Sequence, residues 1–259
     1  MTAPKWRSTR GTALGLPRVH YRGVDSTNER AKRLGALGAP HGTTVTAGEQ
    51  TAGRGRQGRS WAAPAGSALL ASIIVRHLDT RDALLPLAVA VAVCEACEAM
   101  VPVECTIKWP NDVWIERRKV AGILVEGRPQ EGWAVIGVGV NVAMTKDDLP
   151  ADLRDTATSL RMAVERGVGD RHRPPLGVED VLAMLTQSLG ARVREPPERT
   201  IASWRERDAL TGERVAWGAG EGTAAGVDEN GALLVDTASG RVALDAGEVH
   251  LAGPLDDSC

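Results

Sequence analysis

The stretch that most constrains the rest of the chain is Glu49-Gln50-Thr51-Ala52-Gly53-Arg54-Gly55-Arg56-Gln57-Gly58-Arg59-Ser60-Trp61. Its glycines let the backbone come close to a bound group, and its arginines offer fixed donor forks to carboxylate or phosphate oxygens. The flanking segments 43–47 and 68–75 are apolar and have strand character, which a disordered tail would lack. We therefore predict a loop between two strands that cradles a small anion. A solvated Gly/Arg-rich loop is the alternative.

Length and composition limit the classes of protein that this chain can be. Its 259 residues fit one large domain, or a medium domain with a small one. Apolar residues make up 43%, but the aromatics are seven Trp, one Tyr and no Phe, so the core must consist mainly of Val, Leu, Ile and Ala. A formal net charge of −2 lacks the basic field of a dedicated DNA-binding protein.

No segment has the pattern of a secretory signal or a membrane span. The N-terminal residues 1–15 contain basic side chains without an apolar run. The longest apolar run, 83–93, is interrupted by Pro86 and is too short to cross a bilayer. We expect a cytoplasmic protein with neither a membrane nor DNA as its partner.

Cys94 and Cys97 form a C-x-x-C pair inside an Ala/Val-rich helical pattern. A zinc site needs four ligands, and no second pair is available. A redox pair would stand at the start of a helix, so we expect both thiols to pack as small hydrophobic groups.

Patterns along the chain predict an α+β fold, in which a mixed sheet is flanked by helices. The expected strands are 17–24, 42–48, 69–76, 103–109, 113–115, 120–126 and 133–142. The expected helices are 29–37, 82–100, 178–193 and 198–207, with a short segment at 157–164. Beyond residue 210, closely spaced short strands predict a small SH3-like barrel. The expected organisation is an N-terminal extension 1–16, a catalytic domain 17–209 and a C-terminal domain 210–259.

A second polar cluster follows the strand 103–109. Asn111 and Asp112 stand at its turn, where a carboxylate is able to hold Mg²⁺ together with phosphate oxygens. An ordinary Asn-Asp turn is the alternative. A polar turn over residues 116–119 follows, and its last residue, Lys119, opens the next strand beside small residues. As a single feature, such a lysine is more often solvated.

Two glycines at alternate positions of the strand 133–142 also point to a ligand. Gly137 and Gly139 leave one face of that strand bare, so a flat ligand is able to lie on it, with Asn141 at its edge. One G-x-G pattern is weak support without the other clusters.

These clusters together resemble the biotin protein ligases. The matching segments are 25–28, 49–61, 108–112, 118–126, 137–141 and 153–160, and the resemblance covers the chain from about residue 17 to its end. It implies the fold shared with class II aminoacyl-tRNA synthetases and a two-step reaction. Biotin and ATP form biotinyl-5′-AMP and pyrophosphate, and a lysine of a biotin carboxyl carrier domain then takes the biotinyl group.

The resemblance also implies roles for individual residues. Lys119 is the principal catalytic residue, assisted by Arg56 and Arg59, and Asp112 holds Mg²⁺. Biotin is bound by Ser26, Thr27, Asn28, Gln50, Gly53, Arg54, Lys119, Gly122, Gly137 and Gly139. The nucleotide is bound by Arg56, Arg59, Asn111 and Asn141, with Trp61 stacked on adenine.

Two departures from the family pattern affect the expected function. About sixteen residues precede the first matching strand, where bifunctional relatives carry a helix-turn-helix domain, so we expect a ligase without repressor activity. Gln57 stands where some relatives have a further arginine. The rival functions are a lipoate or octanoate ligase of the same fold and a non-enzymatic nucleic-acid binder. A homodimer is possible.

Overall fold

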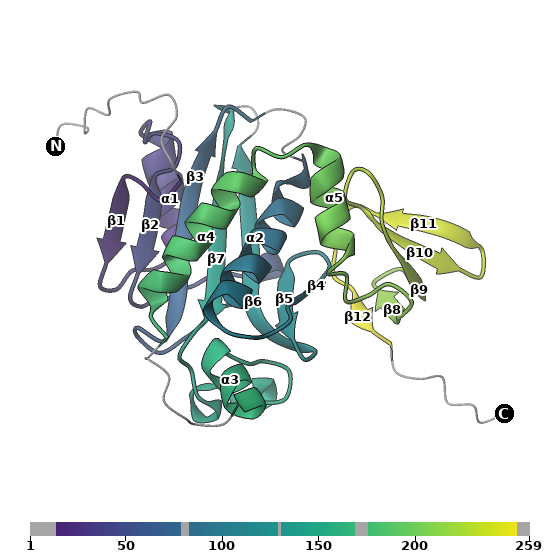
Figure 1. Cartoon of the computed structure of the whole chain (residues 1–259). Coiled ribbons are helices and arrows are strands. Elements are labelled where there is room, and N and C mark those ends of the chain that lie inside the picture. Colours follow the sequence, from purple (N-terminus) through teal and green to yellow (C-terminus); the bar gives the residue numbers. More distant parts are fainter. Residues whose placement is uncertain (1–13, 79–82, 129–130, 169–175, 253–259) are drawn as a thin grey trace.

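The computed structural model describes residues 14–78, 83–128, 131–168 and 176–252. Most of the expected N-terminal extension, together with the first residue of the helix expected at 82–100, lies outside these ranges. Two sheets stand side by side, a large one that carries most of the helices and a small one near the C-terminus (Figure 1). This arrangement matches the expected α+β class.

The large sheet has seven strands in the order β1-β2-β3-β7-β6-β5-β4. Only β1 and β2 pair in parallel, and the other neighbours are antiparallel, so the sheet is mixed as expected. Its strands are β1 (Arg18–Tyr21), β2 (Thr44–Ala47), β3 (Ala68–Arg76), β4 (Thr106–Lys108), β5 (Asp112–Ile115), β6 (Arg118–Arg128) and β7 (Trp133–Asn141).

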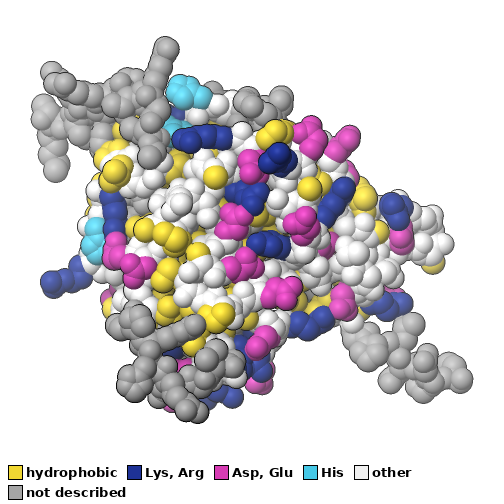
Figure 2. Space-filling model, in the orientation of Figure 1, with side chains coloured by type: hydrophobic (Ala, Val, Ile, Leu, Met, Phe, Trp, Pro, Cys, Tyr) yellow, Lys and Arg dark blue, Asp and Glu magenta, His cyan; other side chains and the backbone are white. Residues whose placement is uncertain are grey.

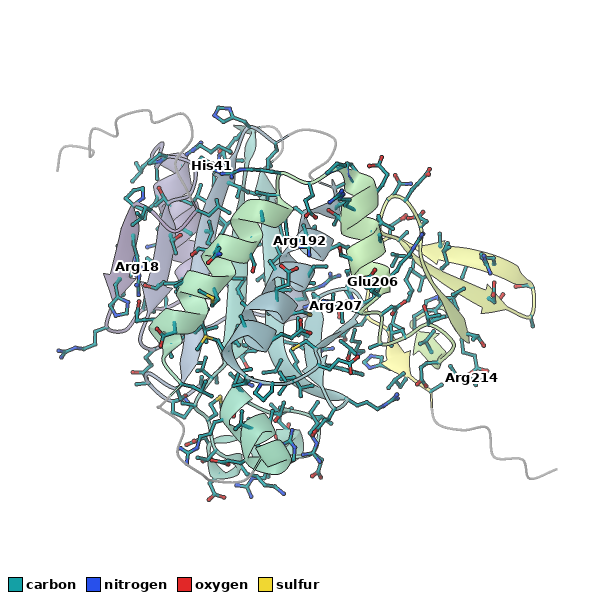
Figure 3. All side chains as sticks on the ribbon, viewed as in Figure 1. Arg18, His41, Arg192, Glu206, Arg207 and Arg214 are labelled. Atoms are coloured by element: carbon teal, nitrogen blue, oxygen red, sulfur yellow. The ribbon has the colours of Figure 1, made fainter. Side chains whose placement is uncertain are left out.

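One face of this sheet is closed by a helical layer. Helix α2 (Leu85–Met100) is apolar on most sides and lies between the sheet, α4 (Val178–Arg192) and α5 (Pro197–Arg205). Its two charged residues, Glu95 and Glu98, pair with arginines from outside the helix. Arg192 of α4 pairs with Glu95, and Arg207, which follows α5, pairs with Glu98 at 2.7 Å. Both arginines are labelled in Figure 3. This layer and the sheet bury the main core, which consists chiefly of Val, Leu, Ile and Ala.

The opposite face is only partly covered. Helix α1 (Thr27–Ala36) packs on β2, β3 and β7 around a small cluster that includes Val45, Ile74 and Trp133. A Cβ at Gly35 would lie 2.7 Å from the Trp133 ring, so this close approach requires glycine. Beyond α1, no α-helix of the described ranges covers the sheet face over β5, β6 and β7, which carries the residues of the candidate site.

The small sheet is antiparallel, with the order β11-β10-β9-β8-β12. Its strands are β8 (Arg214–Trp217), β9 (Gly220–Val227), β10 (Leu233–Thr237), β11 (Gly240–Leu244) and β12 (His250–Leu251). Trp109 Nε1 donates a hydrogen bond of 3.0 Å to the Gly231 carbonyl and joins this sheet to the large one. The remaining helix, α3 (Leu160–Val168), packs on a local apolar cluster that contains Met144 and Leu149.

Charged side chains are spread over the helical side of the molecule. Lysines and arginines alternate there with aspartates and glutamates, and no large single-sign field covers this face (Figure 2). The distribution agrees with the small formal net charge of −2. This face therefore lacks the continuous basic surface that a dedicated nucleic-acid binder would present.

One expected turn is wrong in its extent. The turn between β5 and β6 contains only Glu116 and Arg117, both at positive φ (51° and 60°), instead of the four residues 116–119. A two-residue turn of this kind matches the right-handed twist of the paired strands. Arg118 and Lys119 are therefore strand residues, and Lys119 is fixed by the sheet.

The expectation for the cysteines is confirmed. Cys94 and Cys97 are fully buried in α2, and Cys105 is buried beside them. Across the described ranges no group of three or more His, Cys, Asp or Glu side chains is arranged to hold a metal ion. In the same ranges, no helix has the length and apolar character to cross a bilayer.

Candidate active site

A cavity lies on the uncovered face of the large sheet and gathers most of the predicted site residues. It is lined by Ser26, Thr27, Asn28, Gln50, Arg54, Arg56, Arg59, Trp61, Asn111, Asp112, Lys119, Gly122, Gly137 and Gly139. These residues come from the start of α1, the segment 50–61 that follows β2 and contains the arginine loop 53–61, the turn before β5, and strands β5, β6 and β7. Gly53 and Asn141 do not line this cavity.

The floor of the cavity needs its glycines. A Cβ at Gly137 would lie 2.2 Å from Asn28 Oδ1, and a Cβ at Gly139 would lie 2.5 Å from the Trp61 ring. A Cβ at Gly122 would likewise lie 2.9 Å from that ring. The indole therefore lies over the bare strand face in this structure, and its buried Nε1 has no hydrogen-bond partner among the described residues. The adenine-stacking role of Trp61 stays a prediction.

The start of α1 supplies a compact polar wall. Ser72 Oγ on β3 lies 2.8 Å from Thr27 Oγ1 and 2.6 Å from Asn28 Oδ1. The Thr27 backbone N–H donates to Gln50 Oε1 at 2.7 Å, which fixes the orientation of that amide. Ser26 is the N-cap residue, yet its side chain makes no capping hydrogen bond. Its hydroxyl therefore remains able to bind a ligand.

Charged side chains surround this wall. Glu126 accepts hydrogen bonds of 2.8 Å from both Asn28 and Lys32. Burial by itself raises the pKa of Glu126, but these two donors outweigh it and hold the pKa below its usual value. Glu29 pairs with Lys32 and with Arg54, each at 2.6 Å. Arg54, which we expected near biotin, is therefore held at the rim of the cavity.

The arginine loop closes as a small hairpin. Trp61 N–H donates to the Gly53 carbonyl at 2.9 Å, and Gly55 N–H donates to the Arg59 carbonyl at 2.7 Å. A Cβ at Gly53 would lie 2.2 Å from the Trp61 carbonyl oxygen, so Gly53 is required to close the hairpin. Gln57 at the tip of the hairpin is exposed and does not line the cavity described above.

The hairpin also touches the C-terminal region. Arg59 forms an ion pair with Glu248, and Arg56 Nη2 donates to the Gly247 carbonyl at 3.3 Å. Burial lowers the pKa of the Arg56 guanidinium, an effect that the nearby Asp112 opposes. Two cations that we expected at phosphates thus bind groups of the C-terminal region in this structure.

Lys119 and Asp112 form the charged centre of the site. Lys119 Nζ lies 2.7 Å from Asp112 Oδ1 and 5.6 Å from the centre of the Trp61 ring. The buried Oδ1 therefore faces a cation, and the angles of this contact depart from those of a hydrogen bond. Asn111 donates to the Ile123 carbonyl at 3.1 Å and thereby holds this turn against β6.

A second, larger cavity of about 610 Å³ adjoins the first. Five side chains border both cavities: Arg59, Ser60, Trp61, Asp112 and Lys119. The larger cavity has an apolar wall that includes Trp114, Met144 and Leu149. Asn141 stands at its border, and its buried amide donates to the Thr158 carbonyl at 2.9 Å.

The sequence patterns missed several residues of this site. Lys108 belongs to the quoted 108–112 cluster, yet the pattern suggested no role for it, and it lines the larger cavity. Glu248 is distant in sequence from the arginine it pairs with, so no local signal was able to reveal it. Ser72 and Glu126 lie in strands that were predicted from their apolar residues, so these two polar residues received no role. Both side chains face the side of the sheet that carries the site, where each bonds to Asn28.

Comparison with known proteins agrees with this geometry. Residues 21–142 match the biotin/lipoate A/B protein ligase family, and residues 212–251 match the biotin protein ligase C-terminal domain. The biotin–[acetyl-CoA-carboxylase] ligase of Mycobacterium tuberculosis is 34% identical, over 87% of this chain and 86% of that protein. The bifunctional ligase/repressor BirA of Bacillus spizizenii is 32% identical, over 92% of this chain and 75% of that protein.

A solved structure extends the likeness to the fold. The biotin protein ligase of Aquifex aeolicus, in complex with biotin and ATP, superposes with a TM-score of 0.76 at 27% identity, covering 91% of this chain and 98% of that one. Both halves of the chain are therefore matched by sequence and by structure. The chain belongs to the biotin/lipoate A/B protein ligase family.

Proposed function

We propose that this chain is an ATP-dependent biotin protein ligase, which forms biotinyl-5′-AMP and then transfers the biotinyl group to a lysine of a biotin carboxyl carrier domain. The observation that carries the proposal is the border shared by the two cavities. A reaction between a carboxylate and a phosphorus atom needs two anionic substrates to meet at one point. The shared border supplies Lys119 and Arg59 at such a point.

Biotin would occupy the smaller cavity. Its flat fused ring fits a bare strand face formed by Gly122, Gly137 and Gly139, once the Trp61 indole has moved from that face. The polar wall of Ser26, Thr27, Asn28 and Gln50 offers hydroxyl and amide groups to the ureido group. The carboxylate at the end of the valeryl chain would then point to Lys119.

The nucleotide would occupy the larger cavity. Its apolar wall suits a purine ring, and Trp61 is placed to cover such a ring because it already borders both spaces. Asn141, which borders this cavity and whose amide is held by the Thr158 carbonyl, would bind the ribose. Arg56 and Arg59 would exchange their contacts with Gly247 and Glu248 for phosphate oxygens.

In the first step, a carboxylate oxygen of biotin bonds to the α-phosphorus, and the bond to the bridging oxygen breaks as pyrophosphate leaves. Lys119 would neutralise the repulsion between the carboxylate and the α-phosphate and stabilise the charge that develops between them. Asp112 fits a magnesium ion because it borders both cavities and Mg²⁺ usually takes one or two carboxylates together with phosphates. When bound, Mg²⁺ would offset phosphate charge.

In the second step, the acceptor amine bonds to the acyl carbon, and AMP leaves with the electron pair of the broken acyl–oxygen bond. The intermediate is a mixed anhydride that water would hydrolyse. The hairpin 53–61 would cover it, because the hairpin borders the cavities and bonds to the C-terminal region. We further propose that 17–209 and 210–259 act as a catalytic and a C-terminal domain.

The test is an ATP–pyrophosphate exchange assay with biotin or with lipoate as the acid. Biotin-dependent exchange, followed by labelling of a carrier domain lysine, is the expected result. Exchange driven only by lipoate would replace biotin by lipoate as the substrate. Absence of exchange with either acid, accompanied by salt-sensitive binding to random DNA, would favour a nucleic-acid binder instead.

A further inference from the structure

Lys108 differs from most other cations of the site because it has no anionic partner among the described residues. It ends β4 and stands directly opposite Asp112 in the β4–β5 pair. Asp112 Oδ1, however, pairs with Lys119. Within the described ranges, no carboxylate lies within ion-pair distance of Lys108 Nζ, which instead lies 5.6 Å from the centre of the Trp114 ring.

Most neighbouring cations are paired with carboxylates. Arg54 pairs with Glu29, Arg59 with Glu248, Arg117 with Glu213 and Lys119 with Asp112. Arg56 has no carboxylate at ion-pair distance among the described residues, but its guanidinium donates to the Gly247 carbonyl. The surroundings of Lys108 oppose its charge. Burial lowers its pKa, Asp112 raises it, and Lys119 and Arg59 lower it further. A partly buried ammonium group without a partner is unfavourable, so the site is incomplete until an anion arrives.

The position of Lys108 indicates which anion that is. Lys108 lines the larger cavity but not the smaller one, so it belongs to the nucleotide side. The cations at the shared border, Lys119 and Arg59, are the ones that the proposed function assigns to the α-phosphate. Lys108 projects from the same side of the sheet as Asp112, its directly paired residue, whose carboxylate would accompany the metal-bound phosphates.

We infer that Lys108 binds the two terminal phosphates of ATP and stabilises them as they leave as pyrophosphate, a role that rests on the proposed function. When the biotin carboxylate bonds to the α-phosphorus, the electron pair of the broken P–O bond stays with pyrophosphate. The Lys108 ammonium offsets that added charge. Lys108 then has no part in the second step, in which pyrophosphate is absent.

The two steps can be assayed apart. The variant Lys108→Met keeps an apolar chain against Trp114 and removes the charge. We expect it to raise the KM for ATP and to slow biotin-dependent pyrophosphate exchange by about tenfold to a hundredfold, the loss expected for a charge-assisted hydrogen bond. Transfer from supplied biotinyl-5′-AMP to a carrier domain should stay within about twofold of the wild-type rate. The lost contact is the one between Lys108 and pyrophosphate, and pyrophosphate takes no part in the transfer. Lys108→Arg should retain most of the exchange activity.

Lys146→Ala is the matched control, because this lysine lines neither cavity and should leave both steps unchanged. Equal losses in exchange and in transfer would mean that Lys108 only supports the fold, and would overturn the inference. Wild-type exchange by Lys108→Met would overturn it as well.

Calorimetric binding of magnesium pyrophosphate, without biotin, separates this inference from the proposed function. Weaker binding by Lys108→Met than by wild type supports the pyrophosphate role even if the wild-type protein activates no biotin. Equal binding contradicts the role even if biotin is activated.

Discussion

Gly139 and Val140 are neighbours on β7, yet they face opposite sides of the seven-stranded sheet. Val140 is buried in the main core under the α2 and α4 layer. Gly139 lies on the uncovered face, beneath the Trp61 indole. The same alternation separates Val113 from Asp112 on β5, with the apolar residue in the core and the charged one at the cavity. One face of the sheet therefore provides stability, and the other is kept bare and charged for ligands.

The largest effect should come from the charged centre of the ligand face. Lys119→Ala removes the cation at the border of both cavities, and we expect biotin adenylation to fall by about 10²- to 10³-fold, as for the loss of one electrostatic contact to a transition state. Single-turnover formation of biotinyl-5′-AMP measures this. Arg118→Ala, one position earlier on β6 and outside both cavities, is the control. A near-normal rate in Lys119→Ala would remove this lysine from the mechanism.

A paired substitution on β7 tests the two faces directly. Gly139→Val places carbon atoms where the Trp61 ring now lies, so biotin affinity should fall by about tenfold or more while the core stays intact. Val140→Ala should instead lower the free energy of unfolding by about 2 kcal/mol and leave biotin affinity unchanged, because Val140 lines neither cavity. Calorimetric titration and thermal melting measure the two quantities. If both variants lost affinity equally, the division between the faces would be wrong.

Arg56 tests the loop that covers the ligand face. Arg56→Ala should shorten the retention of biotinyl-5′-AMP on the protein by about tenfold, because a partly buried guanidinium contact to phosphate is lost. Release of labelled adenylate from the washed complex measures it. Gln57→Ala, in the same hairpin but outside both the smaller and the larger cavity, should release adenylate at the wild-type rate. Unchanged retention in Arg56→Ala would rule out its phosphate role.

The smallest effect concerns the rim of the cavity and depends on pH. The folded state holds the pKa of Glu126 below its usual value, so the carboxylate stabilises the fold above the unfolded pKa of about 4.3. That stability is lost as pH falls through the lower folded pKa. Glu126→Gln should therefore reduce Tm at pH 7. The corresponding loss in the free energy of unfolding should be less than about 1 kcal/mol. The difference from wild type should shrink toward zero in acid. A difference that grew in acid would contradict this sign.

Much of the fold follows from local patterns. Strands such as β3 and β7 differ from their expected ranges by one residue, because long apolar runs bounded by turns leave few other registers. The glycines of β7 and the arginine loop indicate the ligand face from the sequence alone, since each breaks an otherwise regular pattern. Their gathering around one cavity follows from the pairing of β3, β7, β6 and β5.

Other features depend on contacts that no local pattern contains. The pairing of Arg59 with Glu248 joins segments that are far apart in the sequence, so only the folded chain reveals it. Lys119 has the surroundings of a turn residue because its neighbours are charged, whereas the twist of the hairpin ends the turn at Arg117. The place of Trp61 over Gly139 depends on how the hairpin closes. Lys108 stands out because most of the cations around it are paired with carboxylates.

The most direct test of the two-faced sheet is a crystal structure of the protein with biotin and a non-hydrolysable ATP analogue bound. We expect the biotin ring over Gly137 and Gly139, its carboxylate and the α-phosphate meeting at Lys119, and the indole of Trp61 moved from the strand face. Biotin bound on the α2 and α4 side, or a nucleotide distant from Lys119 and the hairpin 53–61, would contradict the account.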